Sequence, residues 1–249
     1  MKLSVIICTS NRPESLKKAL QSLKQQSFKD WEILIMRESP LVKARDLGWR
    51  KAKGEIVAWI DDDVILDKNW AKNLVEIFEK NKDVGGVSGP TIVPESLLKN
   101  RLVFWWYGRK DILAKLWVKL VLDNQPFRVG KITTIGWWSP GSNFKSCLKL
   151  KGLQEVDYLE ACNMALRRDL VEKAGGFDLG FKGTSEWCEL DLAMRIKRLG
   201  FSLVWSREVK VEHHVSRSGV FKKRRNWLER IRNYLRFRKS ISAKGGQVC

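Results

Sequence analysis

Three consecutive aspartates, Asp61, Asp62 and Asp63, directly follow an apolar run at residues 56–60 of this 249-residue chain. The run is short and rich in β-branched side chains, which predicts a buried strand. Because buried carboxylates are costly unless paired or metal-bound, the acids should lie where the strand leaves the sheet. Alternate residues of an extended segment point the same way, so Asp61 and Asp63 can share one target.

Paired carboxylates at the carboxyl end of a strand are typical of a site for Mn²⁺ or Mg²⁺ that also holds phosphate oxygens. We expect Asp63 to be the direct ligand, and Asp61 to contact a ribose or to share the metal through water. The alternative is a solvated acidic turn in which an aspartate caps the helix that begins near Asn69.

The composition limits the possible settings and partners. The net charge of +19 suits phosphate-bearing substrates, an anionic membrane surface or nucleic acid, and does not choose among them. Five cysteines without a C-x-x-C spacing argue against a zinc ribbon or a disulfide framework and favour a reducing compartment. With no secretory signal and no long uncharged run, we expect a cytoplasmic protein without a membrane span.

Strands and helices alternate along the first 90 residues. Apolar runs predict strands at 3–8, 31–36 and 84–89, and helical periodicity predicts helices from Pro13, over 43–52 and over 67–80. This alternation favours a parallel, doubly wound sheet. The first helix starts just after a strand, which makes its N-terminus an anion site where Arg12 could meet a phosphate or a base.

Several ordered motifs resemble family 2 glycosyltransferases, which have the GT-A fold. In the first half they are Ser4-Val5-Ile6-Ile7, Thr9-x-Asn11-Arg12-Pro13, Ala44-Arg45-Asp46-Leu47-Gly48 and the Asp61-x-Asp63 motif. In the second half they are Glu160-Ala161-Cys162-Asn163, Gly175-Gly176-Phe177-Asp178 and the stretch from Glu186 to Arg195. The resemblance covers roughly residues 1–215.

This resemblance implies an α/β GT-A fold, Rossmann-like, with a mostly parallel sheet flanked by helices. We expect a GT-A domain over 1–215, divided into a nucleotide-binding half (1–95), a variable insert (96–155) and an acceptor or catalytic half (156–215). A basic amphipathic extension would follow at 216–249.

The resemblance also implies donor-binding and catalytic residues. The nucleotide-sugar would be bound by Thr9, Asn11, Arg12, Glu38, Arg45, Asp61, Asp62 and Asn163. Glu189 stands in the position of the catalytic carboxylate, as the general base that takes the acceptor proton in an inverting transfer. The alternative is a purely structural role, in which Glu189 only stabilises a helix N-terminus.

The sequence leaves alternatives for a further metal ligand and for the base of the donor nucleotide. In relatives, a histidine after a late strand contacts the metal or the diphosphate, and here His213 or His214 could do so, with the spacing favouring His213. The second strand of the family normally ends in an acidic pair, whereas here Arg37 and Glu38 follow it. A UDP-sugar is therefore the first expectation for the donor, and GDP- and dTDP-sugars are alternatives.

The insert and the tail each contain an apolar helical stripe. Ile112, Leu113, Leu116, Trp117, Leu120 and Val121 predict an amphipathic helix near the aromatic segment 105–107. These aromatic residues could be core packing, an acceptor groove or a membrane contact.

Residues 215–244 contain eleven Lys or Arg and a single acid, Glu229. One helical face of this tail collects Trp227, Leu228, Ile231, Tyr234 and Leu235. The pattern favours binding to an anionic membrane surface, and a helix packed on the core is the alternative.

Taken together, these features predict a metal-dependent, inverting glycosyltransferase. It would move a sugar to a hydroxyl of a glycan or lipid-linked acceptor at the inner face of the cell membrane. Two alternatives remain: a sugar nucleotidyltransferase, and a non-catalytic basic module that binds membrane or nucleic acid. Nucleic acid is disfavoured as a partner because no known reader motif accompanies the charge.

Overall fold

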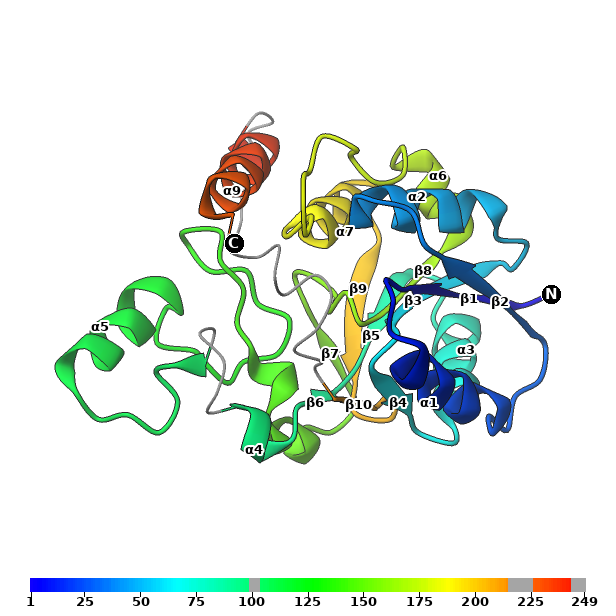
Figure 1. The fold of residues 1–249 in the computed structure, drawn as a ribbon, viewed down its shortest axis with the longest axis horizontal. Coiled ribbons are helices and arrows are strands. Elements are labelled where there is room, and N and C mark those ends of the chain that lie inside the picture. The colour runs from blue at the N-terminus through cyan, green and yellow to red at the C-terminus, as the bar shows by residue number, and fades with distance from the viewer. Residues whose placement is uncertain (99–103, 215–225, 243–249) are drawn as a thin grey trace.

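A seven-stranded mixed sheet forms the centre of the computed structural model, which describes residues 1–98, 104–214 and 226–242 (Figure 1). The strand order is β2-β1-β3-β8-β5-β9-β7, with β8 and β7 antiparallel to their neighbours. The strands are β1 (Leu3–Cys8), β2 (Trp31–Met36), β3 (Ile56–Asp61), β5 (Val84–Ser88), β7 (Leu153–Glu155), β8 (Asn163–Arg167) and β9 (Ser202–Ser206).

Helices cover both faces of this sheet. α2, α6 and α7 lie on one face and α1 and α3 on the other (Figure 1). Their bounds are α1 (Pro13–Lys24), α2 (Leu41–Lys51), α3 (Trp70–Lys80), α6 (Arg168–Lys173) and α7 (Cys188–Arg198). The interior strand β1 is therefore buried on both faces: Ile6 packs under α2, whereas Val5 and Ile7 pack toward α1 and α3.

A second, three-stranded sheet joins β4 (Val64–Leu66), β10 (Val211–His213) and β6 (Thr91–Ile92). β10, the late strand that carries the candidate histidine His213, is the middle strand of this sheet, antiparallel to β4 and parallel to β6. Its register sets His213 opposite Val64, immediately after the three aspartates. This small sheet therefore brings the late histidine to the acidic turn.

The insert between β6 and β8 has its own hydrophobic core. It contains α4 (Glu95–Leu98), α5 (Ile112–Val121) and the 3₁₀ helices η2 (Gly141–Asn143) and η3 (Lys145–Lys149). Phe104 and Trp106 are buried in that core together with Phe144, which supports core packing for the aromatic segment.

The apolar stripe expected on α5 is divided between two surfaces. Ala114 is buried and Trp117 and Val121 pack against the insert core. Ile112 and Leu120, by contrast, are 72% and 62% exposed, and Leu113 and Leu116 are exposed beside them. α5 extends far from the sheet (Figure 1), so one apolar face of this helix is left open.

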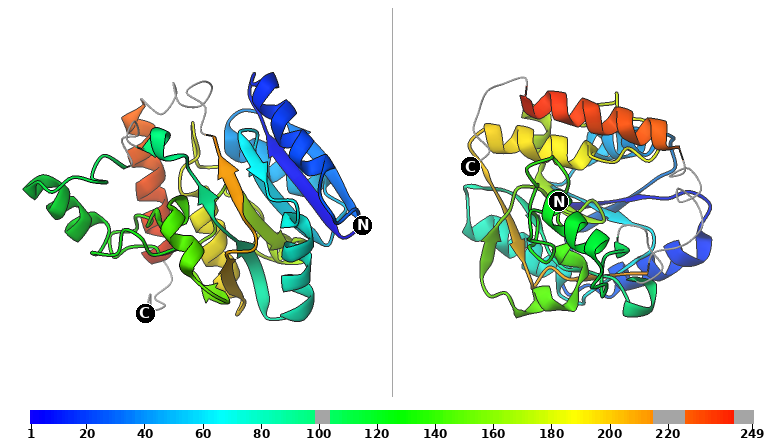
Figure 2. Two further views of the ribbon diagram at one scale, coloured as in Figure 1. Left: turned by 90° about the horizontal axis from the view of Figure 1, so that it is seen from below. Right: turned by 90° about the vertical axis from the view of Figure 1, so that its left-hand side faces the viewer.

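The C-terminal helix α9 (Trp227–Ser242) packs alongside α7 (Figure 2). Phe237 and Asn233 are buried in this contact, whereas Trp227, Leu228, Ile231 and Leu235 are exposed. Apart from Tyr234, which packs on Trp187, the predicted apolar face is thus the outer face of the helix. The rest of the predicted extension, residues 215–225 and 243–249, lies outside the described residues.

Within the described residues, each helix is too short or too polar to span a bilayer.

Candidate active site

The loop after β1 is fastened to the acidic turn that follows β3. Asp62 has a fully buried side chain and accepts hydrogen bonds from the Thr9 hydroxyl and the Arg12 guanidinium. Arg12 Nη1 also lies 2.7 Å from Asp63 Oδ2. Burial raises the pKa of Asp62, and the Thr9 hydrogen bond and the Arg12 charge oppose that shift. These two partners give Asp62 a structural role, and its predicted donor contact stays a prediction.

The three aspartates differ in exposure, and the structure brings one histidine to them. The Asp61 side chain is 30% exposed, whereas that of Asp63 is 5% exposed. His213 Nε2 lies 3.2 Å from Asp63 Oδ1 and 4.0 Å from Asp61 Oδ2. His214 instead is 46% exposed and lies 3.6 Å from Glu212. Of the two candidate histidines, therefore, His213 is the one in the site.

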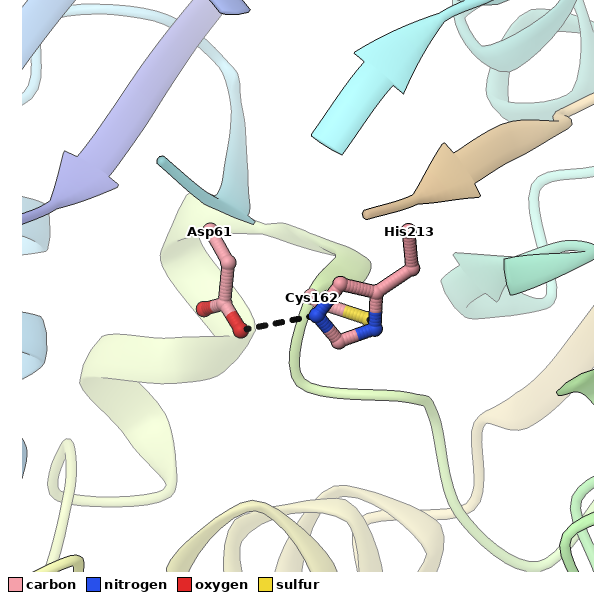
Figure 3. A group of neighbouring side chains, drawn as sticks. All are labelled: Asp61, Cys162 and His213. Carbon is pink, nitrogen blue, oxygen red and sulfur yellow. Dashed lines mark hydrogen bonds and ion pairs between the residues drawn. The ribbon is translucent and has the colours of Figure 1, made fainter. Parts of the chain in front are cut away.

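A cysteine completes this group, although no local pattern predicted it as a ligand. Cys162 Sγ lies 3.6 Å from His213 Nδ1. One ligand atom each of Asp61, Cys162 and His213 lies within 4.8 Å of the other two (Figure 3). β8 pairs antiparallel with β3 so that Asn163 faces Ile60, which places Cys162 next to Asp61. The local sequence pattern does not encode this register between β3 and β8.

These side chains fit a divalent cation. Carboxylate oxygen, imidazole nitrogen and thiol sulfur are donors to divalent transition metals, and here they converge at a partly open rim of the sheet. Asp63 is less open than Asp61, because its two oxygens contact Arg12 and His213. The geometry therefore favours Asp61 over Asp63 as the carboxylate that faces a bound ion.

The predicted base, Glu189, is the second residue of α7 and its side chain is 17% exposed. Its Oε2 lies 3.5 Å from Arg45 Nη1 and 3.5 Å from the Cys188 thiol. Burial alone would lower the pKa of Arg45, but the neighbouring Cys188, Glu189 and Asp61 raise it above its ordinary value. One buried guanidinium thus interacts with both Glu189 and Asp61.

An unusual backbone conformation precedes this base. Trp187, the residue before α7, has φ = 72°, in the left-handed region that bulky side chains rarely adopt. Its ring packs against Trp137, Trp138 and Tyr234, and its Nε1 donates to the Gly136 carbonyl at 3.1 Å. The insert and α9 together therefore fix the conformation from which Glu189 is presented.

The predicted donor residues fall into two groups. Thr9, Asn11 and Arg12 line a surface pocket of about 750 Å³ whose walls also include basic side chains from α1 and Arg37. Glu38 is half-buried beside this region and accepts a hydrogen bond from the Arg37 backbone N–H at 2.9 Å.

Two further predicted donor residues face inward. Asn163 is 1% exposed, accepts from Trp70 Nε1 and donates to the carbonyls of Pro90 and Val209. Its amide joins β8 to α3 and to the loop residues Pro90 and Val209, which gives it a structural role. The expected donor contact stays a prediction. Arg45 is 5% exposed and its guanidinium is directed at Cys188 and Glu189.

Comparison with known proteins agrees with this architecture. Residues 37–173 match the family model described as glycosyl transferase family 2. The chain is 23% identical to the glucosyl-dolichyl phosphate glucuronosyltransferase of Haloferax volcanii, over 86% of this chain and 69% of that protein.

Solved glycosyltransferases share the fold. GalNAc-T7 with UDP, GalNAc and Mn²⁺ superposes with a TM-score of 0.63 at 16% identity, covering 95% of this chain and 47% of that one. The mannosyltransferase PcManGT from Pyrobaculum calidifontis, with GDP-Man and Mn²⁺, gives 0.61 at 14% identity, covering 98% and 65%. S. aureus TarS with UDP gives 0.54 at 14% identity, covering 87% and 61%. These likenesses confirm the predicted GT-A fold.

Proposed function

Since the chain belongs to glycosyl transferase family 2, we propose that it moves a sugar from a nucleotide-diphosphate donor to an acceptor hydroxyl, with inversion at the anomeric carbon. The observation that carries this proposal is the buried guanidinium of Arg45. It lies 3.5 Å from Glu189, and the carbonyl of the same residue accepts a hydrogen bond at 3.2 Å from Trp59 Nε1, on the strand that ends at Asp61. The end of β3 and the carboxylate of α7 therefore border one region. A glycosyl transfer needs both groups there.

The diphosphate end of the donor would lie at the acidic turn. Asp61 and His213 would hold a divalent cation, Mn²⁺ or Mg²⁺, whose charge stabilises the departing nucleoside diphosphate. Asp63 supports this arrangement through its Oδ1, which lies 3.2 Å from His213 Nε2. Thr9, Asn11 and Arg12 border the adjoining pocket, where the N-terminus of α1 favours negative charge.

Glu189 would accept the proton of the acceptor hydroxyl. As that oxygen forms its bond to the anomeric carbon, the bond to the diphosphate breaks on the opposite face, and the electron pair leaves with the diphosphate. A general base in this position contributes roughly 10²–10⁴-fold in rate. Arg45 is a positioning residue, because its contact at 3.5 Å orients the Glu189 carboxylate.

For the donor we propose a UDP-sugar first, with GDP- and dTDP-sugars as alternatives. GalNAc-T7 and TarS contain UDP, whereas PcManGT contains GDP-Man. Arg37 and Glu38 follow β2 in this chain, and Arg37 lines the same pocket as Asn11 and Arg12. This basic wall suits an anionic nucleotide.

We further propose that the acceptor is a glycan or lipid-linked substrate at an anionic membrane surface. The archaeal relative is named for a dolichyl phosphate substrate. α5 and α9 lie at the same end of the molecule (Figures 1 and 2), and both expose apolar stripes. Lys115 and Lys119 accompany the stripe of α5, and Arg232 and Lys239 that of α9. Each basic side chain near anionic lipid adds about 1 kcal/mol.

A thermal-shift screen tests the donor assignment. UDP-, GDP- and dTDP-sugars are added to the full chain and to Asp61→Asn, with and without Mn²⁺. A donor at 100 times its Kd stabilises by about 2.7 kcal/mol, which at this chain length raises Tm by about 5–10 °C. We expect one nucleotide class to give this shift, only with Mn²⁺ and only in the wild type. A shift that is absent for every donor would contradict the proposal.

Vesicle co-sedimentation tests the membrane surface. Wild-type protein should sediment with phosphatidylglycerol-containing vesicles and not with phosphatidylcholine alone. Leu120→Ser and Ile231→Ser each remove an exposed side chain of the two stripes and should weaken binding about tenfold or more. Ile35→Ser, an exposed position on β2, is the matched control and should bind like the wild type. Equal binding by all three variants would contradict the assignment of this surface.

A further inference from the structure

Cys162 lies where the proposed cation would sit, and the proposed transfer gives it no role. Cys162 is 7% exposed, and its Sγ lies 3.6 Å from His213 Nδ1. Asp61 completes the group from the end of β3, with ligand atoms within 4.8 Å of one another (Figure 3). These three side chains come from β3, from the turn before β8 and from β10. Three separate parts of the chain thus converge on one small volume.

The spacing of the soft donors matches that of ligands to a single metal. In a tetrahedral site with metal–sulfur and metal–nitrogen distances of about 2.3 and 2.1 Å, the sulfur and nitrogen lie about 3.6 Å apart. The observed Sγ–Nδ1 separation is 3.6 Å. A hard ion such as Mg²⁺ takes oxygen ligands, whereas thiolates select softer ions such as Co²⁺ and Zn²⁺.

We propose that Cys162 is a ligand of the cation, together with Asp61 and His213, and that it makes this centre select transition metals over Mg²⁺. The proposal rests on the proposed function for the presence of a cation, and it goes further by naming the sulfur ligand and the metal class. Affinity should rise from Mg²⁺ through Mn²⁺ to Co²⁺ and Zn²⁺.

Another buried cysteine provides a matched control. Cys147 is 2% exposed, and the contact of its thiol is with the Ser142 carbonyl at 3.8 Å. Cys147→Ser therefore removes a buried thiol and leaves the candidate centre intact. Cys162→Ser removes the proposed ligand with little change in volume, and Cys162→Ala repeats the test if the serine variant does not fold.

The experiment is a Co²⁺ titration of the metal-free full chain, followed in the ultraviolet–visible spectrum. Bonding of a thiolate to Co²⁺ produces a charge-transfer band that oxygen and nitrogen ligands do not. We expect this band in the wild type and in Cys147→Ser, saturating at one equivalent. Cys162→Ser should lack the band, should bind Co²⁺ at least tenfold more weakly, and should lose its discrimination against Mg²⁺.

Two outcomes separate this inference from the proposed function. If the wild type shows Mn²⁺-dependent binding of a nucleotide-sugar but no thiolate band, the sulfur ligand is refuted and the transferase proposal stands. If the band is present and depends on Cys162 but no nucleotide-sugar binds, the ligand set stands and the transferase proposal fails. A band that persists in Cys162→Ser would overturn the inference directly.

Discussion

Replacing Phe237 by alanine should release α9 from the body of the protein. The Phe237 side chain is fully buried in the main core, so its loss costs about 3–5 kcal/mol. The other anchors are weaker. Asn233 makes two hydrogen bonds to the Lys182 backbone, and Arg236 and Arg230 form ion pairs with Asp178 and Glu186. At about 1 kcal/mol or less each, these contacts are individually well below the contribution of Phe237.

A 16-residue helix is marginal on its own, so α9 should unfold once its anchor is lost. Limited trypsin digestion measures this directly, because exposed basic side chains of α9 become cleavable when the helix opens. We expect cleavage within 230–239 to accelerate at least tenfold in Phe237→Ala. The rate of sugar transfer should fall as well. Tyr234 packs on Trp187, which lies two residues before Glu189 in the chain.

Leu235→Ala is the matched control for this experiment. Leu235 lies on the same helix but is 52% exposed, so its truncation should change stability by less than about 0.5 kcal/mol. Its cleavage rate should equal that of the wild type. If Phe237→Ala and Leu235→Ala behave alike, the packed face of α9 has been assigned wrongly.

Three other interactions in the structure give testable predictions. Arg12→Gln leaves the buried Asp62 without its cationic partner and should lower the free energy of unfolding in urea by about 3–5 kcal/mol; a loss below 1 kcal/mol would refute the pairing. Burial alone would raise the pKa of Asp178, but the hydrogen bond from Arg236 holds it below its usual value. This pair therefore stabilises α9 above about pH 4, the unfolded pKa, and protection of α9 from an acid-active protease should fade as pH drops through the lower folded pKa. His213→Ala should weaken Mn²⁺ binding at least tenfold in calorimetry, whereas the same change at the exposed neighbouring histidine should not.

Local patterns were sufficient to predict four strands of the main sheet (β1, β2, β3 and β5) and the family of the chain. The apolar runs at 3–8 and 31–36 coincide with β1 and β2, because both strands end abruptly at polar residues. The helix predicted over 67–80 begins at Trp70, since the backbone at Asp67 to Asn69 forms a turn that accepts the Trp70 N–H. Such errors concern element ends, where local signals are weakest.

Long-range contacts were what the sequence pattern missed. Cys162 meets Asp61 only because β8 runs antiparallel between β3 and β5, and no local signal encodes that register. α9 has apolar side chains on two faces. The sequence pattern favoured the face with more of them as the functional apolar face. The structure instead buries Phe237 and Asn233. Asn233 can be buried because the Lys182 backbone N–H donates to its side-chain oxygen and the Lys182 carbonyl accepts from its side-chain nitrogen.

The interpretation of Asn163 as a donor contact meets a related difficulty. A polar residue within a family motif suggested a ligand contact, but its amide satisfies buried groups of Trp70, Pro90 and Val209. Unpaired buried polar groups are costly, so an asparagine in the core can be required by the fold alone.

The measurement that tests the central claim most directly compares donor binding with donor turnover in Glu189→Gln. The donor identified by thermal shift is titrated with Mn²⁺ into the variant, and its slow transfer to water is followed by release of nucleoside diphosphate. Glu189→Gln keeps the size of the side chain, so donor affinity should stay within about twofold of the wild type. Turnover should fall by about 10²–10⁴-fold. Turnover at the wild-type rate in a variant that still binds donor would show that the base is not Glu189.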